Sequence, residues 1–174
     1  MLEVLSNNWC MPFQGKARKD KPVEPARALL RLEELCAKAE RCKFELRQKL
    51  YRWHVSPSDS DTIINSLIHR RFLDDERFAR AFVKDKVMFG RWGRRKIQLA
   101  LMSKRISSDT IRNAIEEIDE DVYMDNLREI LIAKARSIDE PNTYDGRTKL
   151  FRFGASRGYE PELVARTIRE EFIS

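Results

Sequence analysis

The residues with the clearest potential for chemistry form a basic segment near the middle of the chain, Phe89–Lys96, which reads Phe-Gly-Arg-Trp-Gly-Arg-Arg-Lys. Its two glycines permit a tight turn around Trp92, and helical spacing of apolar residues resumes after Arg94. A helix that begins there presents unpaired backbone amides to an anion. Cations at a helix N-terminus oppose the helix dipole, so local stability does not explain the arginines. We therefore expect the segment to bind phosphates or acidic side chains, with Trp92 anchoring two helices in the core.

Charge is distributed along the chain in blocks of opposite sign. Lys84–Arg105 holds eight basic residues and one acid, whereas Glu116–Glu129 holds seven acids and one base. The net charge of +6 is compatible with a polyanionic partner. We expect a partner protein or DNA to be bound by basic residues: first Arg91, Arg94, Arg95 and Lys96, then Lys104 and Arg105, and in the equivalent last part of the chain Arg147, Lys149, Arg152 and Arg157.

Motifs of the common enzyme classes are absent from the sequence, namely GxxxxGK(S/T), GxGxxG, HExxH and GxSxG. The acid pair Asp74-Asp75 recurs as Asp119-Glu120, each time where a helix is expected to begin. That recurrence favours helix capping over general acid–base work. We predict no catalytic residue.

The cysteines and histidines do not form a recognisable metal or disulfide pattern. Cys10, Cys36 and Cys42 are odd in number and lack CxxC spacing, and only His54 and His69 could join them as ligands. We interpret the cysteines as reduced thiols in apolar surroundings and the histidines as ordinary surface residues. The sequence therefore predicts no cofactor and no metal.

The elements that position these residues repeat about every fifty residues, a period that is typical of stacked supersecondary units. Ile97–Ile115 aligns without a gap to Leu150–Ile168. An earlier copy, Leu46–Leu67, follows the same course when Asp61-Thr62-Ile63 is matched to Asp109-Thr110-Ile111, which requires roughly three extra residues in its turn. The polar run 58–61 is expected to cap the helix that follows this turn.

Apolar spacing is helical almost throughout, and no run alternates with a period of two. We predict an all-α fold: a tandem, elongated and curved array of three three-helix repeats, with about nine helices. The expected limits are a disordered basic arm over residues 1–25, with Met11 as an alternative start, and repeats over 26–72, 73–118 and 119–174.

Most aromatic residues lie at helical spacing or at equivalent positions of the repeats. They could stack on nucleic-acid bases, but core packing is the stronger interpretation for nearly all of them, with Phe151 the least certain. The residues concerned are Tyr51, Phe72, Phe78, Phe82, Tyr123, Phe151 and Phe153.

No apolar run approaches the roughly 18 residues of a membrane span, and no signal-peptide core lies near Met1. We expect a soluble, cytoplasmic protein that is monomeric.

Several motifs resemble one bacterial family. The string Arg71–Phe82, RFLDDERFARAF, is similar to the central signature of RecX, the regulator of the RecA recombinase, and Phe89–Gly93 with its basic helix is similar to the next block of that family. Glu45–Leu50 resembles the motif of its first unit, and Ser156–Tyr159 the turn of its last. The resemblance runs from about residue 30 to the C-terminus.

The resemblance implies three tandem three-helix units that bind in the helical groove of the RecA–DNA filament. It also implies inhibition of filament extension, ATP hydrolysis, strand exchange and RecA-stimulated cleavage of the SOS repressor. Two other functions stay open from the residues alone: a stand-alone DNA-binding module, against which the acidic block argues, and a helical scaffold for another protein. The sequence leaves undecided whether the filament is capped or bound along its groove, and how far DNA contributes.

Overall fold

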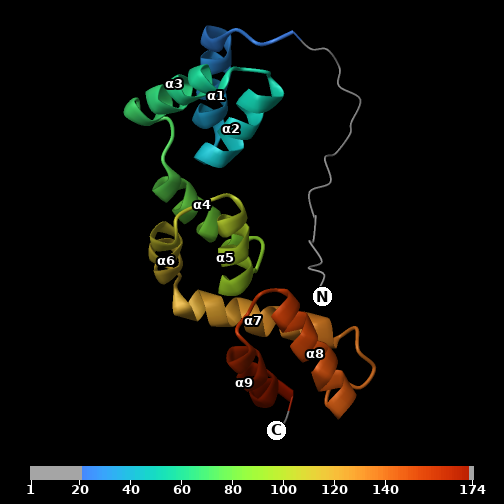
Figure 1. The fold of residues 1–174 in the computed structure, drawn as a ribbon. Coiled ribbons are helices and arrows are strands. Elements are labelled where there is room, and N and C mark those ends of the chain that lie inside the picture. Colours follow the sequence, from blue (N-terminus) through green and yellow to red (C-terminus); the bar gives the residue numbers. More distant parts are fainter. Residues whose placement is uncertain (1–20, 173–174) are drawn as a thin grey trace, which may run out of the picture.

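The computed structural model describes residues 21–172, over which the chain forms nine α-helices and no strand (Figure 1). The predicted all-α class is confirmed. None of the helices in this range is both long enough and apolar enough to cross a membrane. The helices are α1 (Pro25–Lys38), α2 (Lys43–Arg52), α3 (Pro57–His69), α4 (Asp75–Met88), α5 (Arg94–Ser103), α6 (Ser108–Glu116), α7 (Glu120–Ala135), α8 (Tyr144–Ser156) and α9 (Pro161–Phe172).

Most of the predicted basic arm, with Cys10 and Met11, lies outside the described residues. Its last residues are held on the first unit: the Val23 amide donates to the Trp53 carbonyl at 3.0 Å, and the Val23 side chain packs against the first hydrophobic cluster. Pro25 then occupies the first turn of α1, where its missing amide hydrogen costs nothing. Residues 23–25 are therefore part of the first folded unit.

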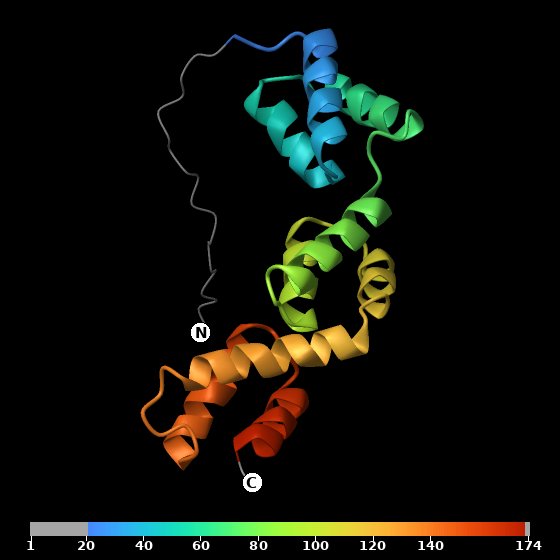
Figure 2. The same ribbon diagram turned by 180° about the vertical axis from the view of Figure 1, so that it is seen from behind.

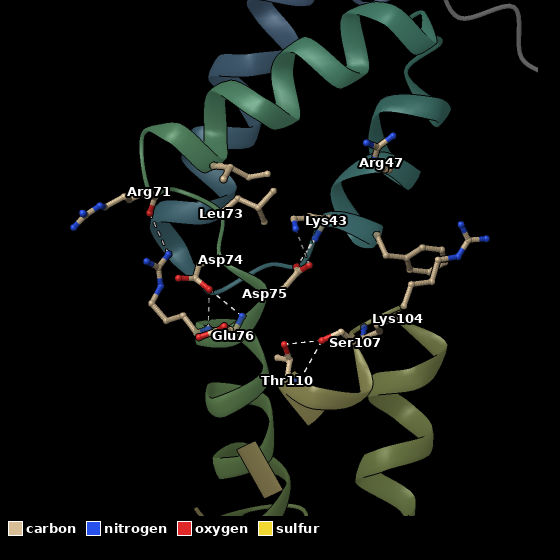
Figure 3. Close-up of a pocket in the computed structure, with 14 residues that line it drawn as sticks. Lys43, Arg47, Arg71, Leu73, Asp74, Asp75, Glu76, Lys104, Ser107 and Thr110 are labelled. Atoms are coloured by element: carbon tan, nitrogen blue, oxygen red, sulfur yellow. Dashed lines mark hydrogen bonds and ion pairs between the residues drawn. The ribbon is translucent and has the colours of Figure 1, made fainter. Parts of the chain in front are cut away.

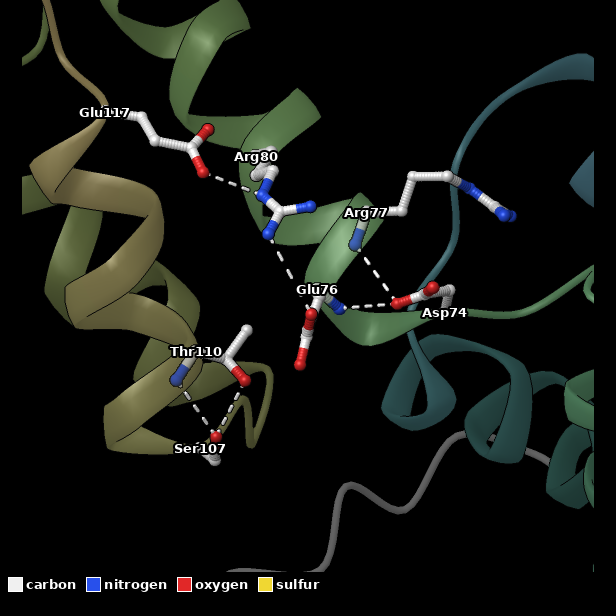
Figure 4. A network of polar contacts seen from close by, with 7 residues as sticks. All are labelled: Asp74, Glu76, Arg77, Arg80, Ser107, Thr110 and Glu117. Carbon is white, nitrogen blue, oxygen red and sulfur yellow. Dashed lines mark hydrogen bonds and ion pairs between the residues drawn. The ribbon is translucent and has the colours of Figure 1, made fainter.

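The acid pairs cap helices, as the sequence predicts. Asp74 accepts the backbone amides of Glu76 and Arg77 at 2.9 and 3.1 Å at the start of α4 (Figure 4). Asp119 accepts the amide of Val122 at 3.0 Å at the start of α7. Both carboxylates also complement the positive end of the helix dipole.

Each triplet turns from its second to its third helix through one residue with a left-handed backbone. These residues are His54, Arg105 and Gly158, with φ of 54°, 59° and 91°. The following residue is buried in every triplet: Val55, Ile106 and Tyr159. This turn satisfies the last carbonyls of the second helix and fixes the register of the repeats.

The first turn has the same length as the other two, so the predicted three extra residues are wrong. When His54 is aligned with Arg105, Ser60 takes the position that Ile111 has in the second repeat. Both of these residues are buried. The match of Asp61-Thr62-Ile63 to Asp109-Thr110-Ile111 is a chance likeness, three residues out of register.

The cap of α3 also differs from the prediction. Ser56, which precedes the polar run 58–61, is the N-cap, and its hydroxyl accepts the amide of Asp59 at 3.1 Å. The helix begins at Pro57, whose fixed φ suits the first helical position. The N-cap is therefore Ser56, immediately before Pro57, and does not belong to the run 58–61.

Each triplet encloses its own hydrophobic cluster. The first is centred on Leu32, Leu46, Leu50, Ile64 and Leu67, the second on Phe78, Val83, Ile97, Leu101 and Ile111, and the third on Tyr123, Leu127, Leu131, Leu150 and Val164. The limits 26–72, 73–118 and 119–174 stay a prediction, because Cys42 from the first triplet is buried in the second cluster.

The three triplets follow one another in an elongated column, with α1–α3 at one end and α7–α9 at the other (Figures 1 and 2). Helix α7 lies across the end of the second triplet, so the column bends there. Such a distributed core leaves much surface per residue, which agrees with the high charged fraction of 36%.

Of the seven aromatic residues singled out in the sequence, six pack in the core and one does not. Phe78 and Tyr123 are buried, and Phe72, Phe82, Phe151 and Phe153 are partly buried against the clusters. Tyr51 is 82% exposed, so the prediction is wrong for this residue. Its position on α2 faces outward, as does Met102 at the equivalent position of α5.

Among the described cysteines, Cys36 is half-buried and Cys42 is buried, and both are free thiols. Burial raises the pKa of both thiols above the usual range, which suppresses the reactive thiolate. Residues 21–172 contain no group of three or more side chains arranged to hold a metal ion.

Candidate partner-binding surface

The N-terminus of α5 is not an open anion site, contrary to the sequence prediction. The backbone amide of Gly93 donates to the Arg157 carbonyl at 2.9 Å, and that of Arg95 donates to the Gly158 carbonyl at 3.1 Å. The amide of Arg94 donates to the Tyr123 hydroxyl at 2.9 Å. Three donors that the sequence assigns to an external anion are therefore satisfied by the third unit.

Two glycines allow this contact between units. A Cβ atom on Gly93 would lie 2.1 Å from the carbonyl carbon of Gly158. A Cβ atom on Gly158 would lie 2.3 Å from Cβ of Lys96, and the φ of Gly158 is +91°. Only glycine permits both the close approach and the left-handed backbone. Gly93, which the sequence assigns to a tight turn, is therefore also needed for the close contact between the second and third units.

A polar cluster completes the joint between the second and third units. The Arg94 guanidinium lies over the Tyr123 ring, 4.1 Å from its centroid, and pairs with Glu160 at 3.5 Å and with Glu120. The Tyr123 hydroxyl donates to Glu160 at 2.7 Å. Burial raises the pKa of Tyr123 far above its usual range, so this hydroxyl keeps its proton and its donor role.

The charge blocks partly neutralise one another within the chain. Arg91 pairs with Glu129 at 2.7 Å, and Arg80 pairs with Glu117 at 2.8 Å (Figure 4). The side chain of Arg157 donates to the Gly90 carbonyl. Arg91, Arg94 and Arg157, three of the residues predicted to bind a partner, are therefore engaged in contacts within the chain.

Lys104 belongs to the other joint, between the first and second units. It pairs with Glu45 of α2. The Lys43 amide and ammonium both contact the Asp75 carboxylate, at 3.0 and 3.5 Å (Figure 3). Arg77 pairs with Glu40 at 2.6 Å. These pairs are partly exposed to solvent, unlike the ring contacts of the other joint.

The remaining predicted residues stay available to a partner. None of them forms an ion pair with an acid of residues 21–172: Arg95, Lys96, Arg105, Arg147, Lys149 and Arg152. Arg95, Arg105, Lys149 and Arg152 are exposed. Lys96 is half-buried over the Trp92 ring at 4.6 Å, which itself packs against the second cluster as predicted, and Arg147 donates to the Asn142 carbonyl at 3.0 Å.

A cleft of about 910 Å³ lies between the first and second units. Figure 3 shows Lys43 and Arg47 on its α2 side and Lys104, Ser107 and Thr110 on the side of the second unit. Sequence reasoning missed Arg47 and Arg71, which also line it, although the Arg71 side chain points away in Figure 3. The sequence motifs place the predicted binding residues in the second and third units. The folded arrangement brings α2 of the first unit beside the turn at Arg105, which the sequence does not indicate.

The fold defines a tandem helical-repeat protein that carries exposed basic side chains on its surface. Residues 74–115 match the family model for RecX, second three-helix domain. A regulatory protein RecX from Clostridium botulinum strain Eklund 17B is 31% identical over 159 residues, which cover 88% of this chain and 71% of that relative. A regulatory protein RecX from Clostridium perfringens strain 13 is 28% identical over 87% of this chain and 70% of its own length. The chain belongs to the RecX family of regulatory proteins.

Solved structures share the fold. The crystal structure of RecX from Lactobacillus salivarius superposes with a TM-score of 0.73 at 18% identity, covering 86% of this chain and 97% of that one. A second crystal structure, of regulatory protein RecX, gives a TM-score of 0.76 at 18% identity, covering 84% and 72% of the two chains. The elongated tandem arrangement is therefore one that solved RecX structures also adopt.

Proposed function

We propose that this protein is a non-catalytic cytoplasmic regulator that binds the filament of RecA recombinase on DNA and inhibits it. The inhibited activities would be filament extension, ATP hydrolysis, strand exchange and stimulation of SOS repressor cleavage, so that DNA repair and recombination are modulated. The observation that carries the proposal is membership of the RecX family, supported by the elongated column of three units.

The shape suits a filament partner. A filament presents the same surface at regular intervals, and three units in a column can contact neighbouring protomers, whereas a compact domain of equal mass reaches fewer. The joint at Gly93 and Gly158 fixes the second unit relative to the third. Such preorganisation lowers the entropy lost on binding.

Exposed cations can guide this encounter. Arg95, Lys149 and Arg152 are exposed and form no ion pair with acids of the described residues. Charges at the rim of an interface chiefly raise the association rate and fix register. We therefore assign the contact with the filament to these three residues and not to Arg91 and Arg94, which are paired within the chain.

The first test is ATP hydrolysis by RecA on single-stranded DNA, with this protein added well below the RecA concentration and DNA in excess. The excess DNA removes simple competition for the substrate strand. A fall in rate is expected, because one bound molecule restrains several protomers. An unchanged rate together with tight DNA binding would replace the proposal by the stand-alone DNA-binding module.

The second test asks whether the exposed basic residues, and not the contacts between units, are needed for inhibition. A triple variant Arg95→Ala, Lys149→Ala, Arg152→Ala should inhibit RecA more weakly, with an unchanged melting temperature. A control variant removes the same charge from other exposed arginines: Arg27→Ala, Arg136→Ala and Arg169→Ala. Equal inhibition by the two triple variants would exclude the assigned surface and leave only net charge.

A further inference from the structure

The outer face of α2 carries an aromatic ring that the fold leaves in solvent. Tyr51 is 82% exposed and borders a hollow of about 450 Å³. The hollow is lined by six residues, which we call the α2 platform: Phe44, Arg47, Gln48, Tyr51, Arg52 and Arg105. The platform holds three guanidinium groups, one amide, two aromatic rings and no carboxylate.

The repeat architecture does not require this composition. The positions equivalent to Tyr51 hold Met102 and Ala155, and the positions equivalent to Arg52 hold Ser103 and Ser156. Phe89 and Tyr144 are also exposed rings, so exposure alone assigns no role; Tyr51 differs because it lines a hollow together with three guanidinium groups. Arg52 lies in the last turn of α2, where the helix dipole favours a cation, but the dipole gives no reason for the ring.

The three arginines of the platform can be released to a ligand. Arg47 pairs with Asp61 at 2.8 Å, but both side chains are more than half exposed, so the pair is weak and screened by salt. Arg105 lies over the Phe44 ring at 5.0 Å and forms no ion pair with the described acids. Arg52 likewise has no acid partner among residues 21–172.

The left-handed turn brings Arg105 to the platform. Its φ of 59° ends α5 and directs the chain back toward α2, so a residue of the second unit completes a hollow of the first. The platform adjoins the larger cleft between these units, because Phe44, Arg47 and Arg105 line both. In that cleft the basic groups are balanced by acids, because Lys43 pairs with Asp75 and Lys104 pairs with Glu45 (Figure 3).

We propose that the α2 platform binds a single-stranded segment of nucleic acid, with one base stacked on Tyr51 and the flanking phosphates held by Arg47, Arg52 and Arg105. An exposed ring amid guanidinium groups suits a base and its phosphates, because every base offers a face for stacking. In a duplex the bases are already stacked, so the ring selects an unpaired strand. An acidic peptide would satisfy the cations but would leave the ring without a role.

This inference does not rest on inhibition of RecA, and its test needs no recombinase. The probe is a fluorescein-labelled oligothymidylate of about 16 nucleotides, near the upper site size of related stacking surfaces. Binding is followed by fluorescence anisotropy at low salt. Tyr51→Ala is expected to weaken binding about tenfold or more, and Tyr51→Phe to preserve it, because stacking needs the ring and not the hydroxyl.

Two controls make the result specific. Met102→Ala changes the equivalent exposed position of α5 and should leave the affinity unchanged. Arg52→Ala with Arg105→Ala should lower the slope of log K against log salt by about 1.4, or about 0.7 for each phosphate that the variant no longer neutralises. Circular dichroism of every variant should match that of the wild type, since the substituted side chains are exposed.

Three outcomes would overturn the inference. The wild type could fail to bind the oligonucleotide, Tyr51→Ala could bind as tightly as Tyr51→Phe, or an abasic oligomer of equal charge could bind as tightly as the oligothymidylate. The last two results would show that the platform recognises charge alone, which is the behaviour expected of a site for an acidic protein segment. RecA inhibition by the wild type, measured separately, tests the proposed function without bearing on this site.

Discussion

The joint between the first and second units differs in its chemistry from the joint between the second and third. In the latter, backbone groups of both units bond directly, and the Arg94 guanidinium lies over the ring of Tyr123, which is fully buried beside Tyr159 of its own unit. In the former, partly exposed ion pairs, such as those of Lys104 with Glu45 and of Arg77 with Glu40, accompany the packing of Cys42 against the second cluster. Exposed ion pairs contribute little and are screened by salt, whereas buried contacts are not.

This difference divides the column into two mechanical parts. The second and third units form a body whose relative orientation is fixed by close packing of backbone at Gly93 and Gly158. The first unit is joined to that body by partly exposed ion pairs and by Cys42 and Phe44, which pack against the second cluster, beside a cleft of about 910 Å³. We therefore expect the first unit to adjust its orientation on a partner while the other two bind as one piece.

The largest effect is expected from Gly158→Ala, which attacks the packed joint directly. The new Cβ would lie 2.3 Å from Cβ of Lys96, on a backbone with φ of +91°. Overpacking and left-handed strain together should lower the free energy of unfolding by about 3 kcal/mol or more. Urea denaturation followed by circular dichroism measures the loss.

The opposite substitution, at the equivalent position of the first unit, tests whether the left-handed turn alone is sensitive. His54→Gly places glycine at the equivalent left-handed residue of the first unit, where φ is 54° and the side chain is exposed. It should be neutral within about 1 kcal/mol, because glycine adopts this backbone freely. A loss in His54→Gly equal to that in Gly158→Ala would mean that the turn, and not the joint, is sensitive.

The next effect is expected from Tyr123→Phe, which keeps the buried ring and removes only its hydroxyl. The Arg94 amide is then left without its acceptor, and Glu160 keeps only its pair with the Arg94 guanidinium. Leaving such groups unpaired in a part-buried site should cost about 1–3 kcal/mol. Thermal and urea unfolding of the variant measure this cost, and an unchanged stability would show that the hydroxyl network does not hold the joint.

A smaller effect is expected at the charged joint. Glu45→Gln removes the partner of Lys104 and should change the free energy of unfolding by less than about 1 kcal/mol. Its signature should be geometric: the distance between fluorophores on the first and second units, measured by energy transfer, should shift in the variant as it does in wild-type protein at about 1 M salt. The distance between the second and third units should not respond to either change, and a response there would remove the distinction between the joints.

The fold was more predictable from sequence than the site. Helical spacing and the recurrence of acid pairs at Asp74 and Asp119 specify local structure, and capping is a local interaction that the sequence displays. The repeat register over Ile97–Ile115 and Leu150–Ile168 is likewise visible, because buried positions recur along each helix. The first turn was misaligned because Ser60 occupies a core position where an apolar residue was expected.

The basic cluster differs from its sequence prediction for another reason. Whether Arg94 faces a ligand or Glu160 depends on the approach of two segments that lie far apart in the sequence, which no local pattern encodes. The acidic block was visible in sequence, but its role as the intramolecular partner of Arg91 and Arg94 required the bend at α7. Tyr51 was assigned to the core because helical spacing does not state which face of a short helix is covered.

The smallest effect at neutral pH is expected from Tyr159→Phe, and it sharpens the contrast with Tyr123. Both rings are buried, but the Tyr159 hydroxyl has no hydrogen-bond partner among residues 21–172. Removing it should leave the free energy of unfolding unchanged or raise it by up to about 1 kcal/mol, since a buried unpaired hydroxyl opposes folding. A loss as large as that of Tyr123→Phe would show that the Tyr159 hydroxyl is bonded in solution.

The two states of Tyr159 also predict a difference at high pH. Burial raises its pKa to about 12 in the folded protein, whereas the unfolded chain releases this proton near pH 10. Between these values the unfolded state binds fewer protons, so stability falls as pH rises from 10 to 12 and is fully present below 10. Lysines titrate over the same pH range, but the wild type and Tyr159→Phe contain the same lysines. The wild type should therefore lose stability more steeply than Tyr159→Phe over this window in urea denaturation, and parallel curves would mean that the Tyr159 pKa is not raised and the ring is not sealed within the joint.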